Sequence, residues 1–223
     1  VDNGNPRDAR LRLQNLTSSL SKVRLLQGHG NVGFARACNY GAALAQTDTL
    51  LFLNPDAVIC SGSRANVSTW EEWMDEAAQV LQQAVAANIP VLGICFGHQL
   101  LCKTLGGEVK RSKDRNDFIT PLYSVGMDTL LSPIRLGLFT HQDQVTRLPP
   151  GARLIISTKH CEFAGMRMAG KPVWGVQFHP EASRSVINQA HADGDMDDAE
   201  FSAFEEDHGG GALLSAFAQL CIP

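Results

Sequence analysis

The sequence of 223 residues lacks two features that mark whole classes of protein. No apolar run approaches the length that spans a bilayer, and the formal net charge is only −4. A broad electrostatic footprint for nucleic acid or an anionic membrane is therefore not expected. The N-terminus has neither the basic nor the apolar segment of a secretion signal. These absences favour a globular cytoplasmic protein that binds neither nucleic acid nor membrane.

The six cysteines are scattered along the chain, without the paired spacing of a zinc site or a disulfide framework. Most are expected to be reduced thiols, several of them packed as small apolar side chains. The chain also lacks a phosphate-binding P-loop motif. We expect neither a metal ion nor an organic cofactor.

Short apolar runs alternate with amphipathic stretches, which is the pattern of βα units around a largely parallel sheet. Helices are predicted over 8–19, 33–46, 68–88, 96–107 and 212–221. Strands are predicted over 22–26, 49–53, 57–60, 90–94, 152–158, 163–170 and 172–178, with weak signals for strands and loops over 108–139.

Two finer expectations concern the helices. Ser68 or Thr69 is expected to cap the helix over 68–88, and Trp73 is expected to face the core. The acidic stretch over 193–207 is expected to be a solvated insertion before the last helix.

A cysteine stands between two glycines where a predicted buried strand meets a predicted helix: Gly93-Ile94-Cys95-Phe96-Gly97. This is the form of a nucleophile elbow. The glycines allow the strained turn to close, and the helix N-terminus favours the reactive thiolate. The backbone N–H of Phe96 then points to where an oxyanion would form.

A thiolate in this position needs a proton shuttle, and the shuttle needs an orienting partner. The strand over 172–178 leads to His179, and Glu181 lies two residues further on the same face of an extended chain. The carboxylate is thus placed to hold the imidazole tautomer while the other ring nitrogen faces the thiol. An elbow cysteine alone is more often a core residue, and a strand-end histidine alone is more often structural. Together, at the carboxyl ends of strands, they favour a catalytic site.

Four segments resemble the class I glutamine amidotransferases, including members similar to the amidotransferase domain of GMP synthase. They are AVICSGSRANVS (57–68), PVLGICFGHQLLCKTLGGEV (90–109), FTHQDQVTRLPPGA (139–152) and PVWGVQFHPEAS (172–183). The resemblance implies a three-layer, flavodoxin-like α/β fold over residues 57–223. It also implies glutamine as the substrate.

The resemblance further implies a role for individual residues. Cys95 would attack the side-chain amide of glutamine, His179 would protonate the departing ammonia, and Glu181 would orient His179. The resulting γ-glutamyl thioester would then be hydrolysed. Backbone N–H groups of Ser63 and Phe96 would stabilise the oxyanion. The remaining residues implied near the substrate are Gln99, Thr140 and His141, although His141 is as readily interpreted as a loop-supporting histidine. His98 is expected to be structural.

The first 57 residues resemble a piece of a family 2 (GT-A type) glycosyltransferase, similar to rhamnosyltransferase-like members. The matching segments are VDNGNP (1–6), NVGFARACNYGAALAQ (31–46) and TLLFLNPDA (49–57). The resemblance implies an incomplete βαβ fragment over 1–56, with Asp2 and Asp56 at nucleotide-sugar and metal positions. We interpret Asp56 as a turn residue, because the rest of that family's sites is missing.

The leading functional prediction is glutamine amide hydrolysis that supplies ammonia to an acceptor, with a separate synthetase chain as a possible partner. Two alternatives stay open. One is a γ-glutamyl hydrolase or related cysteine peptidase that uses the same three residues. The other is a catalytically silent chimeric relative.

Overall fold

The computed structural model describes residues 7–18, 25–28, 44, 51–54, 57–131, 134–194, 196–204 and 208–220. The chain divides into two compact units, Val1–Leu50 and Leu51–Pro223. In the first unit, helix α1 (Arg7–Ser18) agrees with the helix predicted over 8–19. Of the helix predicted over 33–46, the structure describes only residue 44, in a turn, and Asp2 and Asp56 lie outside the described residues. The domain boundary at 56/57 and the glycosyltransferase resemblance therefore stay predictions.

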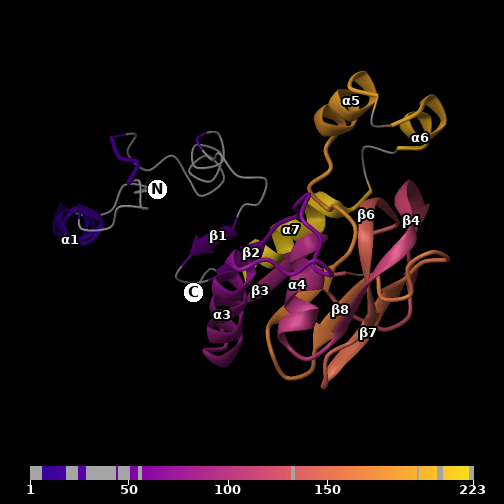
Figure 1. Ribbon diagram of the computed structural model, residues 1–223. Helices are drawn as coiled ribbons and strands as arrows, with labels where there is room; N and C mark the ends of the chain where they lie inside the picture. The colour runs from indigo at the N-terminus through magenta and orange to yellow at the C-terminus, as the bar shows by residue number, and fades with distance from the viewer. Residues whose placement is uncertain are drawn as a thin grey trace. The chain divides into compact units, whose positions relative to one another are not determined.

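A seven-stranded sheet forms the centre of the second unit (Figure 1). The strand order is β1-β2-β3-β9-β8-β7-β5. The bounds are Leu51–Asn54 for β1, Ala57–Cys60 for β2, Val91–Ile94 for β3, Val173–Val176 for β9, Gly165–Met168 for β8, Ala152–Ser157 for β7 and Tyr123–Ser124 for β5. β2, β3 and β9 are parallel neighbours, and the remaining pairs are antiparallel.

The expectation of a largely parallel sheet is therefore correct at the centre and wrong at both flanks. β7, β8 and β9 follow one another through the short connections 158–164 and 169–172. Such connections join antiparallel strands, whereas parallel neighbours need a crossover of about a dozen residues or more. The connection from β2 to β3 is such a crossover, and it contains helix α3 (Trp73–Ala86).

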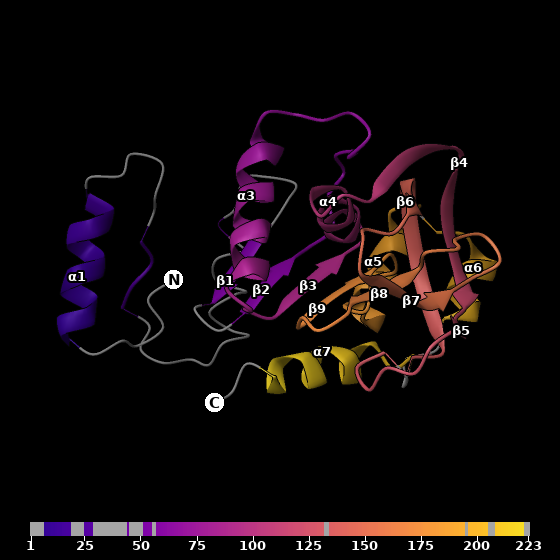
Figure 2. The same ribbon diagram turned by 90° about the horizontal axis from the view of Figure 1, so that it is seen from below.

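The sheet lies between two layers of helix. Helices α3 and α4 (Phe96–Thr104) cover one face, and α7 (Gly210–Gln219) covers the other (Figure 2). Alternate residues of the central strands serve the two faces: Val91 and Val173 pack with Leu81 of α3, while Val176 packs with Phe217 of α7. Within the described parts of the chain, no helix is long and apolar enough to cross a membrane.

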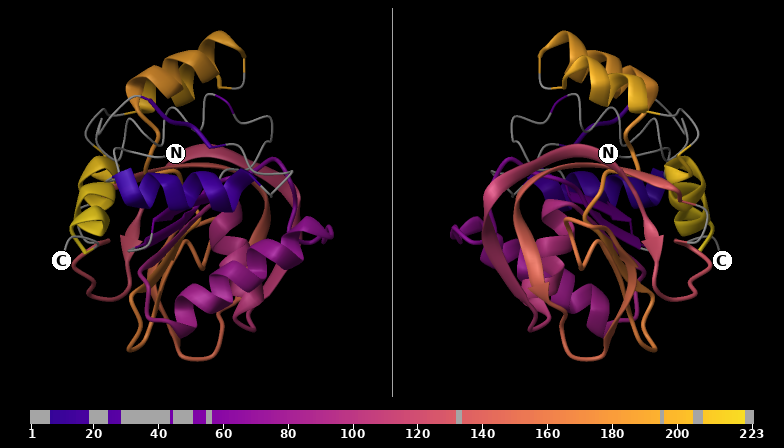
Figure 3. Two further views of the ribbon diagram at one scale, coloured as in Figure 1. Left: turned by 90° about the vertical axis from the view of Figure 1, so that its left-hand side faces the viewer. Right: turned by 90° about the vertical axis from the view of Figure 1, so that its right-hand side faces the viewer.

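Two long strands form a separate antiparallel ribbon, β4 (Glu108–Pro121) with β6 (Leu136–Arg147). Figure 3 shows it as a curved band beside the main sheet. The sequence signals here were weak. Along β6 the buried positions alternate with partly exposed ones, but they include the polar His141 and Asp143 between Phe139 and Val145. An inward face that is half polar does not produce the apolar alternation by which a strand is predicted.

The acidic stretch is folded, and its description as a solvated insertion is wrong in part. Helices α5 (Arg184–Ala192) and α6 (Asp198–Ala203) enclose a small apolar cluster that includes Ile187, Met196 and Phe204, all buried. Asp197 caps α6 through a capping box with Glu200. Several acidic side chains therefore cap a helix or face solvent, while three apolar side chains hold the segment to the protein.

Helix α3 begins later than predicted, at Trp73. Ser68 does not cap it: the Ser68 N–H and hydroxyl both donate to the buried carboxylate of Asp143, at 2.6 and 2.7 Å. This pair of bonds holds the preceding loop against β6, so the chain cannot turn into the helix at Ser68. Trp73, expected in the core, is 37% exposed, whereas the neighbouring Met74 is fully buried.

The glycine after the β3–α4 turn is required by a backbone contact. A Cβ atom on Gly97 would overlap the carbonyl oxygen of Cys60, and the Cys60 carbonyl carbon would lie 2.6 Å away.

We predict that Gly97→Ala destabilises the protein by about 3 kcal/mol, because two backbones would have to separate. Gly211→Ala, in α7 with no heavy atom within 4 Å of the new Cβ, is the matched control. It should stabilise by about 0.5–1 kcal/mol. Urea unfolding of both variants measures the difference, and equal effects would contradict the contact.

Candidate active site

Cys95 occupies a strained turn between β3 and α4. Its backbone angles are φ 51° and ψ −107°, a conformation that non-glycine residues rarely adopt. The turn is held on both sides, since Cys95 N–H donates to Val176 O at 2.8 Å and Gly97 N–H donates to Ser61 O at 3.2 Å. The predicted nucleophile elbow is therefore present, with the thiol carried on the first residue before the helix.

The loop over 61–63 lies directly against the elbow. A Cβ atom on Gly62 would be 3.0 Å from Cε1 of His179 and 3.7 Å from Cβ of Cys95. Ser63, the next residue, lines the same cavity as Cys95 and Phe96. Ser63 and Phe96, the two residues predicted to supply oxyanion N–H groups, thus line the same cavity as the Cys95 thiol.

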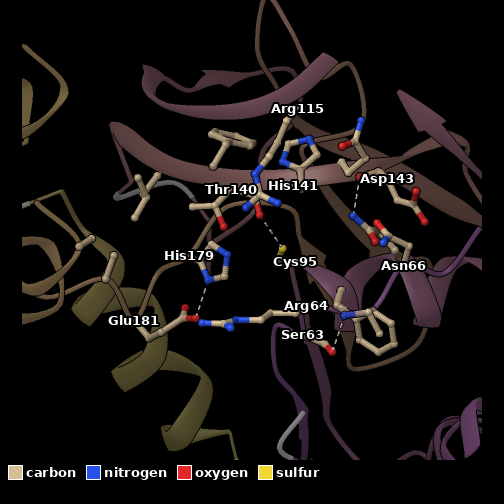
Figure 4. A pocket seen from close by; sticks show the side chains of 18 of the residues that line it. Ser63, Arg64, Asn66, Cys95, Arg115, Thr140, His141, Asp143, His179 and Glu181 are labelled. Atoms are coloured by element: carbon tan, nitrogen blue, oxygen red, sulfur yellow. Dashed lines mark hydrogen bonds and ion pairs between the residues drawn. The ribbon is translucent and has the colours of Figure 1, made fainter. Parts of the chain in front are cut away.

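His179 and Glu181 form a close pair beside the thiol. Nδ1 of His179 is 2.7 Å from Oε1 of Glu181. Nε2 is buried, and among the described residues it has no hydrogen-bond partner. Figure 4 shows the Cys95 sulfur beside the imidazole, with Glu181 on the other side of the ring. The backbone N–H of His179 donates to Leu138 O at 3.0 Å, which fixes the residue against β6.

The charge state of His179 depends on these two neighbours. Burial lowers the pKa of His179, but the negative charge of a Cys95 thiolate and the Glu181 carboxylate together outweigh burial, and the pKa lies well above 6.5. An imidazolium with one nitrogen on a carboxylate and the other facing a sulfur is the arrangement of a cysteine nucleophile with its acid–base partner.

Two further predicted residues lie on β6. The carbonyl oxygen of Thr140 is 4.0 Å from the Cys95 sulfur, within range of a weak S–H···O hydrogen bond that the thiol donates. His141 is 4% exposed. Burial, followed by the positive charges of His179, His98 and Arg115, lowers the pKa of His141 to about 4. His141 is therefore neutral at pH 7, and it lines the cavity as an uncharged polar side chain.

Gln99 is 3% exposed, and its amide hydrogens are committed to the protein. Nε2 donates to the backbone oxygen of Asp143 at 2.6 Å and to Oε1 of Gln177 at 3.1 Å. What remains for a ligand is the Gln99 side-chain oxygen, which can accept a bond from an ammonium group. His98, predicted to be structural, is fully buried and bonded to Phe163 O at 3.0 Å.

A single cavity of about 720 Å³ brings the predicted site residues together. Those that line it are Ser63, Cys95, Phe96, Gln99, Thr140, His141, His179 and Glu181. More of the lining comes from the 61–66 loop, from β4 and from the segment that contains α5 and α6. The lining there includes Arg64, Arg111, Arg115, Val186, Ala190, Met196 and Glu200.

Sequence reasoning missed two polar residues of this site, Asp143 and Gln177. Asp143 ties the 61–70 loop to β6 through Ser68, and Gln177 reaches the Cys95 sulfur at 3.6 Å. A signal was present for Gln177, because it is the one polar residue in the apolar strand segment PVWGVQF. A fully buried polar side chain in such a run needs a partner, and that need marks a position to examine.

Fold and site together define a class of protein, an α/β protein with a cysteine elbow and a histidine–glutamate pair at the carboxyl ends of central parallel strands. Residues 35–196 match the family model described as "Glutamine amidotransferase class-I". The chain belongs to the class-I glutamine amidotransferase family. The match begins at residue 35, ahead of the domain boundary predicted at residue 57.

Similar proteins include two kinds of GMP synthase. The chain is 37% identical over 147 residues to "GMP synthase [glutamine-hydrolyzing]" of Ralstonia pickettii, covering 61% of this chain and 26% of that protein. It is 30% identical over 136 residues to a glutamine-hydrolyzing GMP synthase subunit from Pyrococcus abyssi, covering 60% of this chain and 70% of that one. The chain thus matches about a quarter of the length of the larger relative.

The fold agrees with solved structures. A glutamine amidotransferase from Thermotoga maritima superposes with a TM-score of 0.64 at 21% identity, over 75% of this chain and 79% of that one. A second, from Methylobacillus flagellatus, gives 0.60 at 20% identity, over 74% of each chain. The mixed sheet with a parallel centre is therefore the fold of this family.

The contact between His179 and Glu181 predicts a titration change. Glu181→Gln removes the carboxylate charge that raises the pKa of His179, so the pKa should fall and less imidazolium should remain at neutral pH. NMR titration of ¹³C-labelled histidine measures this. Asp198→Asn is the control. Asp198 pairs with His191, also at 2.7 Å, and neither residue lines the cavity. It should leave the His179 titration unchanged, and an unshifted His179 in Glu181→Gln would contradict the assigned pair.

Proposed function

We propose that this chain hydrolyses the side-chain amide of glutamine and releases ammonia, with Cys95 as nucleophile. The observation that carries the proposal is the buried Nε2 of His179, which faces the elbow cysteine while Nδ1 is held by Glu181. Membership of the class-I glutamine amidotransferase family supports the choice of glutamine. The names of the relatives, which include the word glutamine-hydrolyzing, support it further.

In the proposed reaction, the Cys95 sulfur attacks the amide carbon of glutamine and a tetrahedral oxyanion forms. Backbone N–H groups of Ser63 and Phe96 stabilise that oxygen. His179 gives its proton to the departing nitrogen, ammonia leaves, and a γ-glutamyl thioester remains on Cys95. His179 then takes a proton from water, whose hydroxide attacks the thioester. Glutamate is released, and the proton returns to the Cys95–His179 pair.

A separate chain is proposed as the ammonia acceptor. The Pyrococcus abyssi relative is named as one subunit of GMP synthase, and this chain matches 70% of its length. A protein of that kind supplies one part of a larger enzyme. If the chain hydrolysed glutamine at the same rate with and without the acceptor enzyme, the proposed dependence on a partner would be wrong.

Replacing the nucleophile tests the function directly. Cys95→Ala should lower glutamine hydrolysis by roughly 10⁴-fold or more, because the covalent step is removed. It should also abolish labelling by a glutamine-like diazoketone. Cys102→Ala is the control: Cys102 lies in α4, the helix that follows Cys95, and is fully buried against Met166. This variant should keep both labelling and turnover at a temperature where it is folded. Full glutaminase activity in folded Cys95→Ala would exclude the mechanism.

The cavity favours a second candidate, a hydrolase of larger γ-glutamyl amides. Its volume of about 720 Å³ lies in the range of pockets that hold drug-sized ligands, which is more than the side chain of glutamine requires. Arg64, Arg111 and Arg115 line part of the same cavity. Guanidinium groups favour carboxylates, so a leaving group with an acidic tail would suit this part best.

A substrate panel separates the two candidates. If glutamine is the substrate, kcat/KM for glutamine should exceed that for γ-glutamyl-glutamate and γ-glutamyl-alanine by at least about tenfold. If the larger cavity binds the leaving group, the order should reverse, and the acidic dipeptide should be preferred over the neutral one. Release of ammonia or amino acid is measured for each compound with the same protein preparation. A lack of turnover of every member would contradict both candidates.

A further inference from the structure

We propose that the side chain of Gln177 is a fixed hydrogen-bond donor to the sulfur of Cys95, and that it stabilises the thiolate form of this nucleophile. Gln177 directly follows β9, and its side chain is fully buried. Nε2 lies 3.6 Å from the Cys95 sulfur, within the range of an N–H···S bond. The inference rests on the proposed function for its catalytic meaning, but the contact is independent of the substrate.

The direction of the amide follows from a chain of hydrogen bonds that starts at a backbone carbonyl. The oxygen of Asp143 can only accept, so the atom of Gln99 that lies 2.6 Å from it is the NH₂ group. The same NH₂ group lies 3.1 Å from the Gln177 side chain, which must present its oxygen there. The Gln177 NH₂ group is then the end that faces the sulfur. An amide flip would break both bonds.

The backbone of the two residues is held as firmly as the side chain. Gln177 N–H donates to Ala164 O at 2.9 Å, and Cys95 N–H donates to Val176 O at 2.8 Å. The second bond places the residue after Val176 next to Cys95. A donor fixed in this way costs no reorganisation when the sulfur becomes negative, and a bond to a charged acceptor is stronger than one to a neutral acceptor.

The two protonation states of the sulfur have different partners. A thiol can donate toward the carbonyl oxygen of Thr140, at 4.0 Å, which is a weak bond. A thiolate cannot donate, and it accepts from Gln177 while it faces His179. Gln177 therefore favours the state that attacks, and Thr140 favours the resting thiol.

The pH dependence of Cys95 alkylation tests this without any substrate. Iodoacetamide reacts with the thiolate, and mass spectrometry of the Cys95 peptide gives the rate at each pH. In Gln177→Met, a nearly isosteric change that removes the donor, the midpoint should rise by about one pH unit. This corresponds to a roughly tenfold smaller thiolate fraction below both midpoints.

A second variant gives the order that a purely structural role would not produce. Gln177→Glu keeps an oxygen for Gln99 and almost the same shape, but it places an acidic group beside the sulfur. Its midpoint should lie above that of Gln177→Met, because a like charge is added. Gln82→Met is the control. It removes an exposed amide on α3 that donates to the backbone oxygen of Thr104 in α4, and it should keep the native midpoint.

Thermal unfolding of each variant shows whether it is folded. If either folded Gln177 variant keeps the native midpoint, the proposal is wrong. A shifted midpoint in a protein that hydrolyses no glutamine would support the Gln177 contact and contradict the proposed function, so the two failures are distinguishable.

Discussion

The close approach of the β3–α4 turn to β2 is the constraint on which the rest of the site depends. Gly97 lies so near the Cys60 carbonyl that no side chain fits between them. The Cys95 backbone conformation is strained, and it persists because the surrounding bonds over-determine it. One bond ties the turn to the loop that follows β2, and another ties it to the end of β9. A single contact region therefore sets the positions of Cys95, of the 61–63 loop and of the segment that carries His179.

A layer of buried polar groups holds these parts in register. Asp143 receives two bonds from Ser68 through its carboxylate and one from Gln99 through its backbone oxygen. Gln99 in turn donates to the side-chain oxygen of Gln177, and the Gln177 NH₂ group lies against the Cys95 sulfur. Fully satisfied polar networks in a low-dielectric interior are specific, because each misplacement leaves a buried group without a partner. The network therefore connects the ribbon, the elbow helix and the central strand β9 within a few ångströms of Cys95.

The helices α5 and α6 give the cavity its further extent. They follow the His179–Glu181 segment directly, and their apolar cluster packs on the ribbon side chains Ile119 and Leu138. Arginine side chains from the ribbon, Arg111 and Arg115, line the same cavity. The same cavity is thus lined by residues at the ends of the central strands and by residues of α5 and α6.

The sequence by itself determined the central strands, the elbow and helix α4, because these depend on local patterns, and the site residues that it predicted line one cavity. Val91–Ile94 is a compact apolar run, and the two glycines around Cys95 allow the strained turn that a nucleophile elbow requires. It could not determine the antiparallel flanks, strand β6, the start of α3 or the fold of 184–204. In β6 the buried His141 and Asp143 hide the alternation, and Ser68 is taken from its expected cap by a carboxylate 75 residues away. Only the tertiary structure decided these features, since each depends on a partner distant in the chain. The same holds for Gln177, whose role is defined by a sulfur 82 residues away.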